Sequence, residues 1–108
     1  WYIDRDWNYA LAQQKLVLVE CGRLECGNCK YFVEQVLPQF KDLSLRYVGV
    51  ASDIDLENTP ASRIWSTYMR DAELLPIVFI VNGKGEFIRG ISGTQCLNRA
   101  TVENFLNK

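Results

Sequence analysis

The sequence predicts an α/β sandwich of three layers, in which helices cover both faces of a central mixed β-sheet. Two uninterrupted apolar runs, Leu16–Val19 and Ile77–Val81, are typical of strands that are buried on both faces. Segments with apolar residues at helical spacing stand before, between and after these runs. Asn82-Gly83 follows the second run and is a strong signal for a β-hairpin. Covered strands that alternate with amphipathic helices indicate the α/β class.

Length and composition favour one soluble domain over residues 1–108. The chain is 48% hydrophobic and 23% charged, which is typical of a packed globular protein. Twelve basic and thirteen acidic residues give a net charge of −1, so no basic surface is expected to bind nucleic acid. The apolar runs are far shorter than the roughly 20 residues that cross a bilayer, so no membrane-spanning segment is expected. The absence of histidine excludes a Ser-His or Cys-His dyad within the chain.

The first half of the chain is predicted to contain two helices and two strands. Asp6 is expected to cap a short helix that ends before Lys15 and carries apolar residues at Trp7, Ala10 and Leu11. Leu16–Val19 then forms a central strand, and Leu45–Ala51 a second strand. A helix lies between these strands, with Pro38 expected to kink or restart it. Its predicted apolar stripe consists of Cys29, Val33, Val36, Leu37 and Phe40.

The second half is predicted to contain a helix, a hairpin and a last helix. Thr59 followed by Pro60 is a helix start, and the apolar face of that helix is expected in the core. That face consists of Ile64, Trp65, Tyr68 and Met69. Ile77–Val81 and Glu86–Ile91 form the hairpin, and a final helix carries Val102, Phe105 and Leu106. The order predicts a βαβ unit plus a ββα unit, with an extra N-terminal helix.

Cys26-Gly27-Asn28-Cys29 stands where the first covered strand gives way to a helix. The unpaired N–H groups and the dipole at a helix start stabilise a thiolate, which favours Cys26 as the nucleophile. Cys29 lies three residues later on the inward stripe, within reach for a disulfide and more shielded. Gly27 leaves room for the backbone of a partner. A C-x-x-C pair beside a βαβ pattern indicates thiol-disulfide chemistry.

These segments together resemble the thioredoxin superfamily over almost the whole chain. The resemblance rests on Val17–Glu20, the CGNC motif six residues after Glu20, Leu75–Ile80 and Asn82–Gly85. Within the superfamily, the chain is similar to bacterial thioredoxin-like domains that begin with a Trp-containing helix. It is also similar to the C-terminal periplasmic domain of the transmembrane disulfide-interchange reductase. The resemblance implies the thioredoxin fold and a thiol-disulfide oxidoreductase, acting as a protein-disulfide reductase or isomerase.

The resemblance also implies roles for individual residues. Cys26 matches the nucleophile, Cys29 the resolving cysteine and Pro76 a cis-proline that shapes the substrate groove. Glu20 matches a buried acid that exchanges a proton with Cys29 through a water; the alternative is a solvated carboxylate at a strand end. The residues expected to bind substrate are Gly27, Asn28, Leu75, Pro76 and Gly93. Glu25 departs from the family, which has an aromatic residue before the first cysteine, and its negative charge opposes thiolate formation.

The other two cysteines leave alternatives open. Cys21 and Cys96 are expected to be small buried apolar groups, while a Cys21–Cys96 disulfide or a third exchanging thiol at Cys96 is the alternative. Cys21, Cys26 and Cys29 also have the C-x4-C-x2-C spacing of an iron-sulfur ligand set, with Cys96 available as a fourth ligand. A four-thiolate zinc site is a further alternative, although its usual spacing is missing.

The expected activity needs no bound cofactor and no metal, because the two thiols carry the electrons. The expected partners are protein substrates with disulfides or thiols and an upstream redox donor or acceptor protein, and we expect a monomer. The competing hypothesis is a non-catalytic interaction domain with a static disulfide. Because the most similar family members are extracytoplasmic, a periplasmic location is expected, with a cytoplasmic one left open. The chain begins at Trp1, so any signal peptide or anchor is expected to have been removed.

Overall fold

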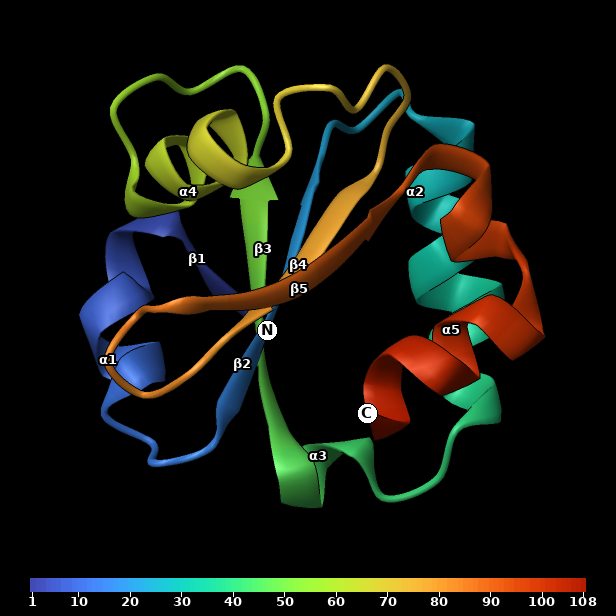
Figure 1. The fold of residues 1–108 in the computed structure, drawn as a ribbon, viewed down its shortest axis with the longest axis horizontal. Helices are drawn as coiled ribbons and strands as arrows, with labels where there is room; N and C mark the ends of the chain where they lie inside the picture. The colour runs from blue at the N-terminus through green and yellow to red at the C-terminus, as the bar shows by residue number, and fades with distance from the viewer.

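A computed structural model describes residues 1–108 and contains a five-stranded mixed sheet with helices on both faces (Figure 1). The strands are β1 (Tyr2–Ile3), β2 (Leu16–Gly22), β3 (Tyr47–Asp53), β4 (Ile77–Val81) and β5 (Phe87–Ser92). Their order across the sheet is β1-β3-β2-β4-β5. β3 pairs in parallel with β1 and β2, whereas β4 is antiparallel to β2 and β5. The predicted three-layer α/β sandwich is confirmed.

The helices divide between the two faces of the sheet. α1 (Trp7–Leu11) and α4 (Pro60–Tyr68) cover one face, on the left in Figure 1. α2 (Gly27–Tyr31) and α5 (Arg99–Asn107) cover the other face, and the short α3 (Leu43–Arg46) leads into β3. Four further helical segments complete the chain: η1 (Asp4–Asp6), η2 (Phe32–Val36), η3 (Leu37–Gln39) and η4 (Gly93–Leu97). No helix is long and apolar enough to cross a membrane.

The central strands are buried because both of their faces carry apolar side chains. Every residue of β4 is buried, as is every residue of β2 after Leu16. Alternate residues of β2 enter different cores: Leu18 packs with α5, and Val17 and Val19 pack with α1 and α4. The continuous apolar runs therefore predict these two strands correctly.

The helix after the cysteines departs from the predicted stripe. α2 continues into the π-helical segment η2 and then into the 3₁₀ segment η3, which Pro38 enters at its start. The buried residues of this region are Cys29, Phe32, Val36 and Leu37, so the inward face takes in Phe32 three residues after Cys29. Phe32 is fully buried and was missing from the predicted stripe, whereas Val33 is half-buried and packs against the same core as predicted; the expected restart at Pro38 is confirmed.

Three local predictions need correction. Leu45 lies in α3 and is exposed, so the strand begins at Tyr47 and not at Leu45. Asp6 makes no capping bond to α1; its carboxylate instead accepts from Ile3 N at 3.4 Å. Tyr68 is exposed rather than part of the core, and its ring stacks on Phe87 with centroids 4.6 Å apart. Neither the short strand β1 nor its pairing with β3 was predicted.

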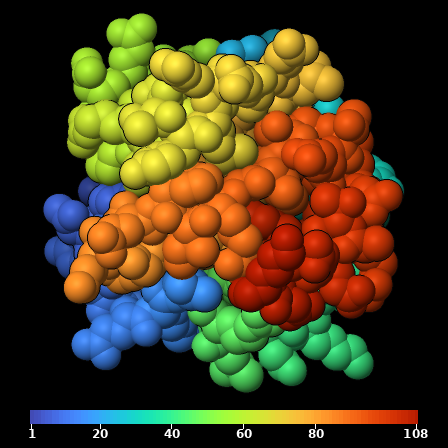
Figure 2. All heavy atoms as spheres, in the orientation of Figure 1, coloured from blue at the N-terminus to red at the C-terminus, as the bar shows by residue number.

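The predicted cap of α4 and the β4–β5 hairpin are both present. Thr59 Oγ1 accepts from Ser62 N at 3.0 Å, and Pro60 is the first residue of the helix. The hairpin turn is longer than two residues, because Asn82 N donates to Glu86 O across it. Figure 2 shows this hairpin in orange beside the red segment of η4 and α5, with the chain that precedes β4 along the upper edge.

Candidate active site

The strand register brings three separate segments of the chain to one end of the sheet. Cys21, near the end of β2, pairs with Ile77 at the start of β4, and Ile77 pairs with Ser92 at the end of β5. The chain after β2, before β4 and after β5 therefore meets at this end, at the upper edge of Figure 1. These three segments carry the CGNC motif, Leu75-Pro76 and Gly93.

Cys26 and Cys29 form a disulfide at the start of α2, with their Cα atoms 5.2 Å apart. Cys26 is the N-cap residue, and its Sγ accepts a hydrogen bond from Cys29 N at 3.1 Å. Cys29 is only 4% exposed, whereas Cys26 is half-buried. The sulfur of Cys26 is thus both the more accessible one and the one that receives the N–H of the first helical turn, an arrangement that favours a thiolate when the disulfide is reduced.

The loop before β4 carries Leu75 and Pro76, and Leu75 contacts the CGNC motif. The Leu75–Pro76 peptide bond is cis, and Pro76 is buried. Asn28 Nδ2 donates to Leu75 O at 3.3 Å, which ties the motif to this loop. Pro76 O in turn accepts from Gly93 N at 2.9 Å. Asn28, Leu75, Pro76 and Gly93 therefore lie together beside the disulfide.

The two glycines expected to bind substrate have different surroundings. Gly27 is exposed, and a Cβ added to it would have no atom within 4 Å. Gly93 is buried and has a φ of +58°, a conformation that favours glycine. A Cβ on Gly93 would lie 2.8 Å from the Cβ of Leu74. Leu74 thus covers Gly93 and is itself exposed to solvent.

Glu20 is a buried acid on the face of β2 that carries α2. It is 8% exposed, and burial raises its pKa from 4.5 to about 7, because the charged carboxylate is poorly solvated there. The carboxyl group therefore changes its protonation state near neutral pH. This placement is that of a buried acid and not of a solvated carboxylate at a strand end.

Gly22 is the point at which Glu20 and Cys29 approach each other. A Cβ on Gly22 would lie 2.5 Å from Glu20 Oε2 and 2.6 Å from Cys29 Sγ. The distance between Glu20 Oε2 and Cys29 Sγ therefore cannot exceed the sum of these two distances. One water molecule can bridge a gap of that size. Sequence reasoning did not single out Gly22. Gly22 is the last residue of β2 and lies beyond the predicted run Leu16–Val19, so no strand signal in the sequence marked this close approach.

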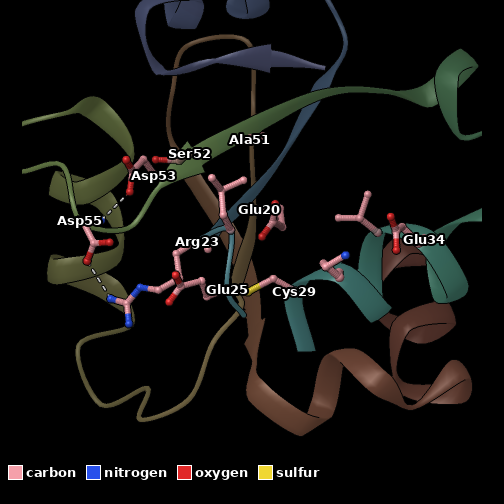
Figure 3. A pocket seen from close by; sticks show the side chains of 13 residues that line it. Glu20, Arg23, Glu25, Cys29, Glu34, Ala51, Ser52, Asp53 and Asp55 are labelled. Carbon is pink, nitrogen blue, oxygen red and sulfur yellow. Dashed lines mark hydrogen bonds and ion pairs between the residues drawn. The ribbon is translucent and has the colours of Figure 1, made fainter. Parts of the chain in front are cut away.

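A cleft of about 790 Å³ reaches Glu20 and Cys29 from the solvent (Figure 3). It opens between the ends of β2 and β3 and the first turns of the α2 helix. Its wall is rich in acidic residues, and Arg23 in that wall is paired with Asp55 at 2.7 Å. The lining residues that carry charge are Glu20, Arg23, Glu25, Lys30, Glu34, Asp53 and Asp55. Solvent thus reaches the carboxyl group from behind the disulfide.

Cys21 and Cys96 are free, fully buried thiols in different cores. Cys21 packs with α1 and α4, and Cys96 packs on the opposite face of the sheet, so a Cys21–Cys96 disulfide is excluded. Burial and, to a smaller extent, the charge of Glu20 together raise the pKa of Cys96 to about 12 and that of Cys21 above its usual range. No group of three or more Cys, Asp or Glu side chains is placed to hold a metal ion.

Solved structures with the same fold are thioredoxins. The thioredoxin of Schistosoma mansoni is 28% identical, with a TM-score of 0.60, and the match covers 98% of this chain and 89% of that one. Chlamydomonas reinhardtii thioredoxin f2 is 14% identical, with a TM-score of 0.67 and coverage of 98% and 93%. Mitochondrial thioredoxin 3 of Saccharomyces cerevisiae is 17% identical, with a TM-score of 0.62 and coverage of 96% and 88%. No protein-family model and no curated protein sequence matches the chain.

Proposed function

The chain is a member of the thioredoxin superfamily, and from this premise we propose that it is a thiol-disulfide oxidoreductase that acts on protein substrates through Cys26 and Cys29. The observation that carries the proposal is the disulfide at the start of α2, with Cys26 Sγ at the N-cap and Cys29 behind it. That position favours ionisation of Cys26 and keeps the second sulfur within reach.

The first step forms a mixed disulfide. In the reduced protein, the thiolate of Cys26 attacks one sulfur of a substrate disulfide. The bond between the two substrate sulfurs breaks, and the second sulfur leaves as a thiolate that takes a proton from water. The half-buried position of Cys26, compared with the buried Cys29, makes it the sulfur that an incoming disulfide reaches first.

The second step releases the substrate. Cys29 gives up its proton to the carboxylate of Glu20 and attacks Cys26 Sγ, so the mixed disulfide breaks and the substrate sulfur leaves as a thiolate. The substrate has gained two electrons, and the protein holds the Cys26–Cys29 disulfide. With a pKa of about 7, Glu20 can accept this proton at neutral pH and pass it to solvent through the cleft. The same steps in reverse oxidise a dithiol.

Substrates are expected to bind as an extended segment beside Pro76. Leu75, which precedes β4, makes no backbone hydrogen bond: its N–H is unpaired and its carbonyl accepts only from the side chain of Asn28, so an added strand can pair here. Gly27 leaves room for that segment next to Cys26, and the exposed Leu74 above Gly93 offers an apolar contact. Specificity then depends on the side chains that border this main-chain edge.

Reduction of insulin disulfides by dithiothreitol tests the proposed function. The chain is expected to accelerate the reaction, and Cys26→Ser is expected to return the rate to that of dithiothreitol alone. Ser66→Ala, on the exposed side of α4, is the matched control and is expected to keep the full rate. A parent protein that gives no acceleration, or a Cys26→Ser variant as fast as the parent, overturns the proposal.

A further inference from the structure

We propose that Asn28 restricts the use of extended peptides as substrates by competing with them for the main-chain carbonyl of Leu75. The inference rests on the proposed function and names a specificity-determining residue for it. The observation is the hydrogen bond from Asn28 Nδ2 to Leu75 O at 3.3 Å, which joins residues 47 positions apart. Asn28 thereby occupies the acceptor that an added strand needs.

Leu75 supplies the open main-chain edge at this site. Its N–H and its carbonyl take part in no backbone hydrogen bond, because β4 begins only at Ile77. Pro76 has no N–H, and its carbonyl already accepts from Gly93 N. A peptide that aligns beside the disulfide therefore finds one unpaired N–H and one acceptor, both on Leu75. The acceptor is the group held by Asn28.

The direction of approach makes the two donors compete. A carbonyl oxygen has two lone pairs and can accept twice. Asn28, however, lies between the two cysteines in sequence and reaches Leu75 O from the motif. A substrate disulfide must lie on that same side to be attacked by Cys26. We therefore expect the amide of Asn28 and the N–H of a bound peptide to approach the oxygen from the same side.

The size of the effect follows from the strength of the bond. A neutral hydrogen bond contributes a modest net free energy, which corresponds to roughly two- to tenfold in an equilibrium constant. The length of 3.3 Å lies at the long end for an N–H donor, so a peptide can displace the amide. Small disulfides without a main chain do not use Leu75 and experience no competition. Asn28 is therefore expected to select between substrate classes and not to set the overall rate.

A purely structural role for Asn28 predicts a different result. If the bond only held the motif against the loop before β4, its loss would weaken the turnover of every disulfide equally. Competition instead predicts that loss of the amide improves binding, and only for substrates that carry a main-chain donor. The peptide N–H is thus the variable that separates the two roles.

The test compares Asn28→Ala with the parent on three disulfide substrates. The first is a short extended peptide disulfide, the second is the same peptide with the N–H next to its cysteine replaced by an ester oxygen, and the third is 5,5′-dithiobis(2-nitrobenzoate). Asn28→Ala is expected to lower KM about two- to tenfold for the amide peptide only. Asn28→Leu keeps the bulk of the side chain but not the N–H donor. It is expected to give the same ratio of amide-peptide KM to ester-peptide KM as Asn28→Ala. Asn8→Ala, on an exposed side chain of α1, is the control and is expected to change nothing.

An equal change in KM for the amide and ester peptides, or an increase for the amide peptide, overturns the role of Asn28. Turnover of the small disulfide by the parent reports separately on the proposed function. Should the parent turn over no disulfide, the proposed function fails, and the Asn28 inference is decided by the dissociation constants of the two peptides with cysteine replaced by serine. The inference requires that Asn28→Ala bind the amide peptide more tightly than the parent does, with no such gain for the ester peptide. If the ratio of the two dissociation constants is the same in the variant and the parent, the inference is contradicted.

Discussion

Glu20 Oε2 and Cys29 Sγ lie against the same side of Gly22: a Cβ built on Gly22 would be 2.5 Å from the oxygen and 2.6 Å from the sulfur. The two groups are therefore close enough for one water molecule to bridge them. This relationship joins the only strongly perturbed carboxyl group of the chain to the buried half of the disulfide. The cleft behind the disulfide opens onto both groups (Figure 3). The proposed route for a proton from Cys29 to solvent runs through this junction of β2 and α2.

Replacement of Glu20 by glutamine is expected to slow the release of substrate. Without a carboxylate, Cys29 must lose its proton to water, so the second step becomes at least about tenfold slower at pH 7 and follows the titration of the thiol itself. The measurement is the pH dependence of the decay of a preformed mixed disulfide on Cys26. Above about pH 9, where a thiol ionises without help, the decay rates of the variant and the parent should become more similar. Superimposable pH profiles for the two proteins would remove Glu20 from the mechanism.

The stability of the oxidised protein is expected to fall as the pH rises from about 4.5 to about 7. In that range the Glu20 carboxyl of the unfolded chain is ionised while the folded chain keeps it protonated, so the folded state binds more protons. Below about pH 4.5, the carboxyl group is protonated in both the folded and the unfolded chain, so Glu20 causes no loss of stability. Above about pH 7, the full penalty is on the order of 3 kcal/mol.

Chemical denaturation at a series of pH values measures this slope. Glu20→Gln is expected to remove most of it and to be more stable than the parent at pH 7.5. Glu25→Gln, at an exposed carboxylate in the same cleft, is the control and should keep the parent's slope. Parallel curves for the parent and Glu20→Gln would show that Glu20 is ionised in the folded protein.

Gly22→Ala is expected to destabilise the oxidised protein by about 1–3 kcal/mol, because its methyl group would overlap Glu20 and Cys29. The carboxylate can move away, whereas Cys29 Sγ is fixed by the disulfide. Thermal or urea unfolding measures the loss. Gly83→Ala is the matched control, since its Cβ would meet only Leu11 O at 3.8 Å. Equal stabilities of the two variants would contradict the close packing around Gly22.

The two cysteine variants are expected to fail at different steps. Cys26→Ser cannot form a mixed disulfide, whereas Cys29→Ser forms one and cannot resolve it. Incubation with a protein disulfide substrate, followed by acid quenching and non-reducing electrophoresis or mass spectrometry, should show a covalent adduct only for Cys29→Ser. An adduct on Cys26→Ser, or its absence on Cys29→Ser, would reverse or remove the assigned roles.

Much of the fold could be predicted because its signals are local. The apolar runs of β2 and β4 have no polar residue that an exposed face would need, and Thr59-Pro60 carries its capping chemistry within four residues. The π turn at Phe32 and the strand β1 could not be predicted, because each depends on packing against distant segments. Leu45 shows the same limit: an apolar residue that remains exposed in α3 looks like a strand residue in sequence.

The same distinction holds for the candidate site. The spacing of Cys26 and Cys29 at a helix start is visible in the sequence. The position of Cys29 against Gly22, and of Asn28 against Leu75, depends on the register between β2 and β4. Residues that are adjacent only through that register carry no local signal. Gly22 ends β2 three residues after the predicted run Leu16–Val19, and a glycine at that point does not reveal which groups fill the space beside it.

The reduction potential of the Cys26/Cys29 couple tests the central claim most directly, because it separates a disulfide that exchanges from one that only holds the chain together. Equilibration with glutathione or dithiothreitol redox buffers, followed by thiol labelling and mass spectrometry, gives the value. The account predicts a potential between roughly −270 and −120 mV, the range of exchanging disulfides. A potential below about −300 mV, typical of structural disulfides, would contradict it.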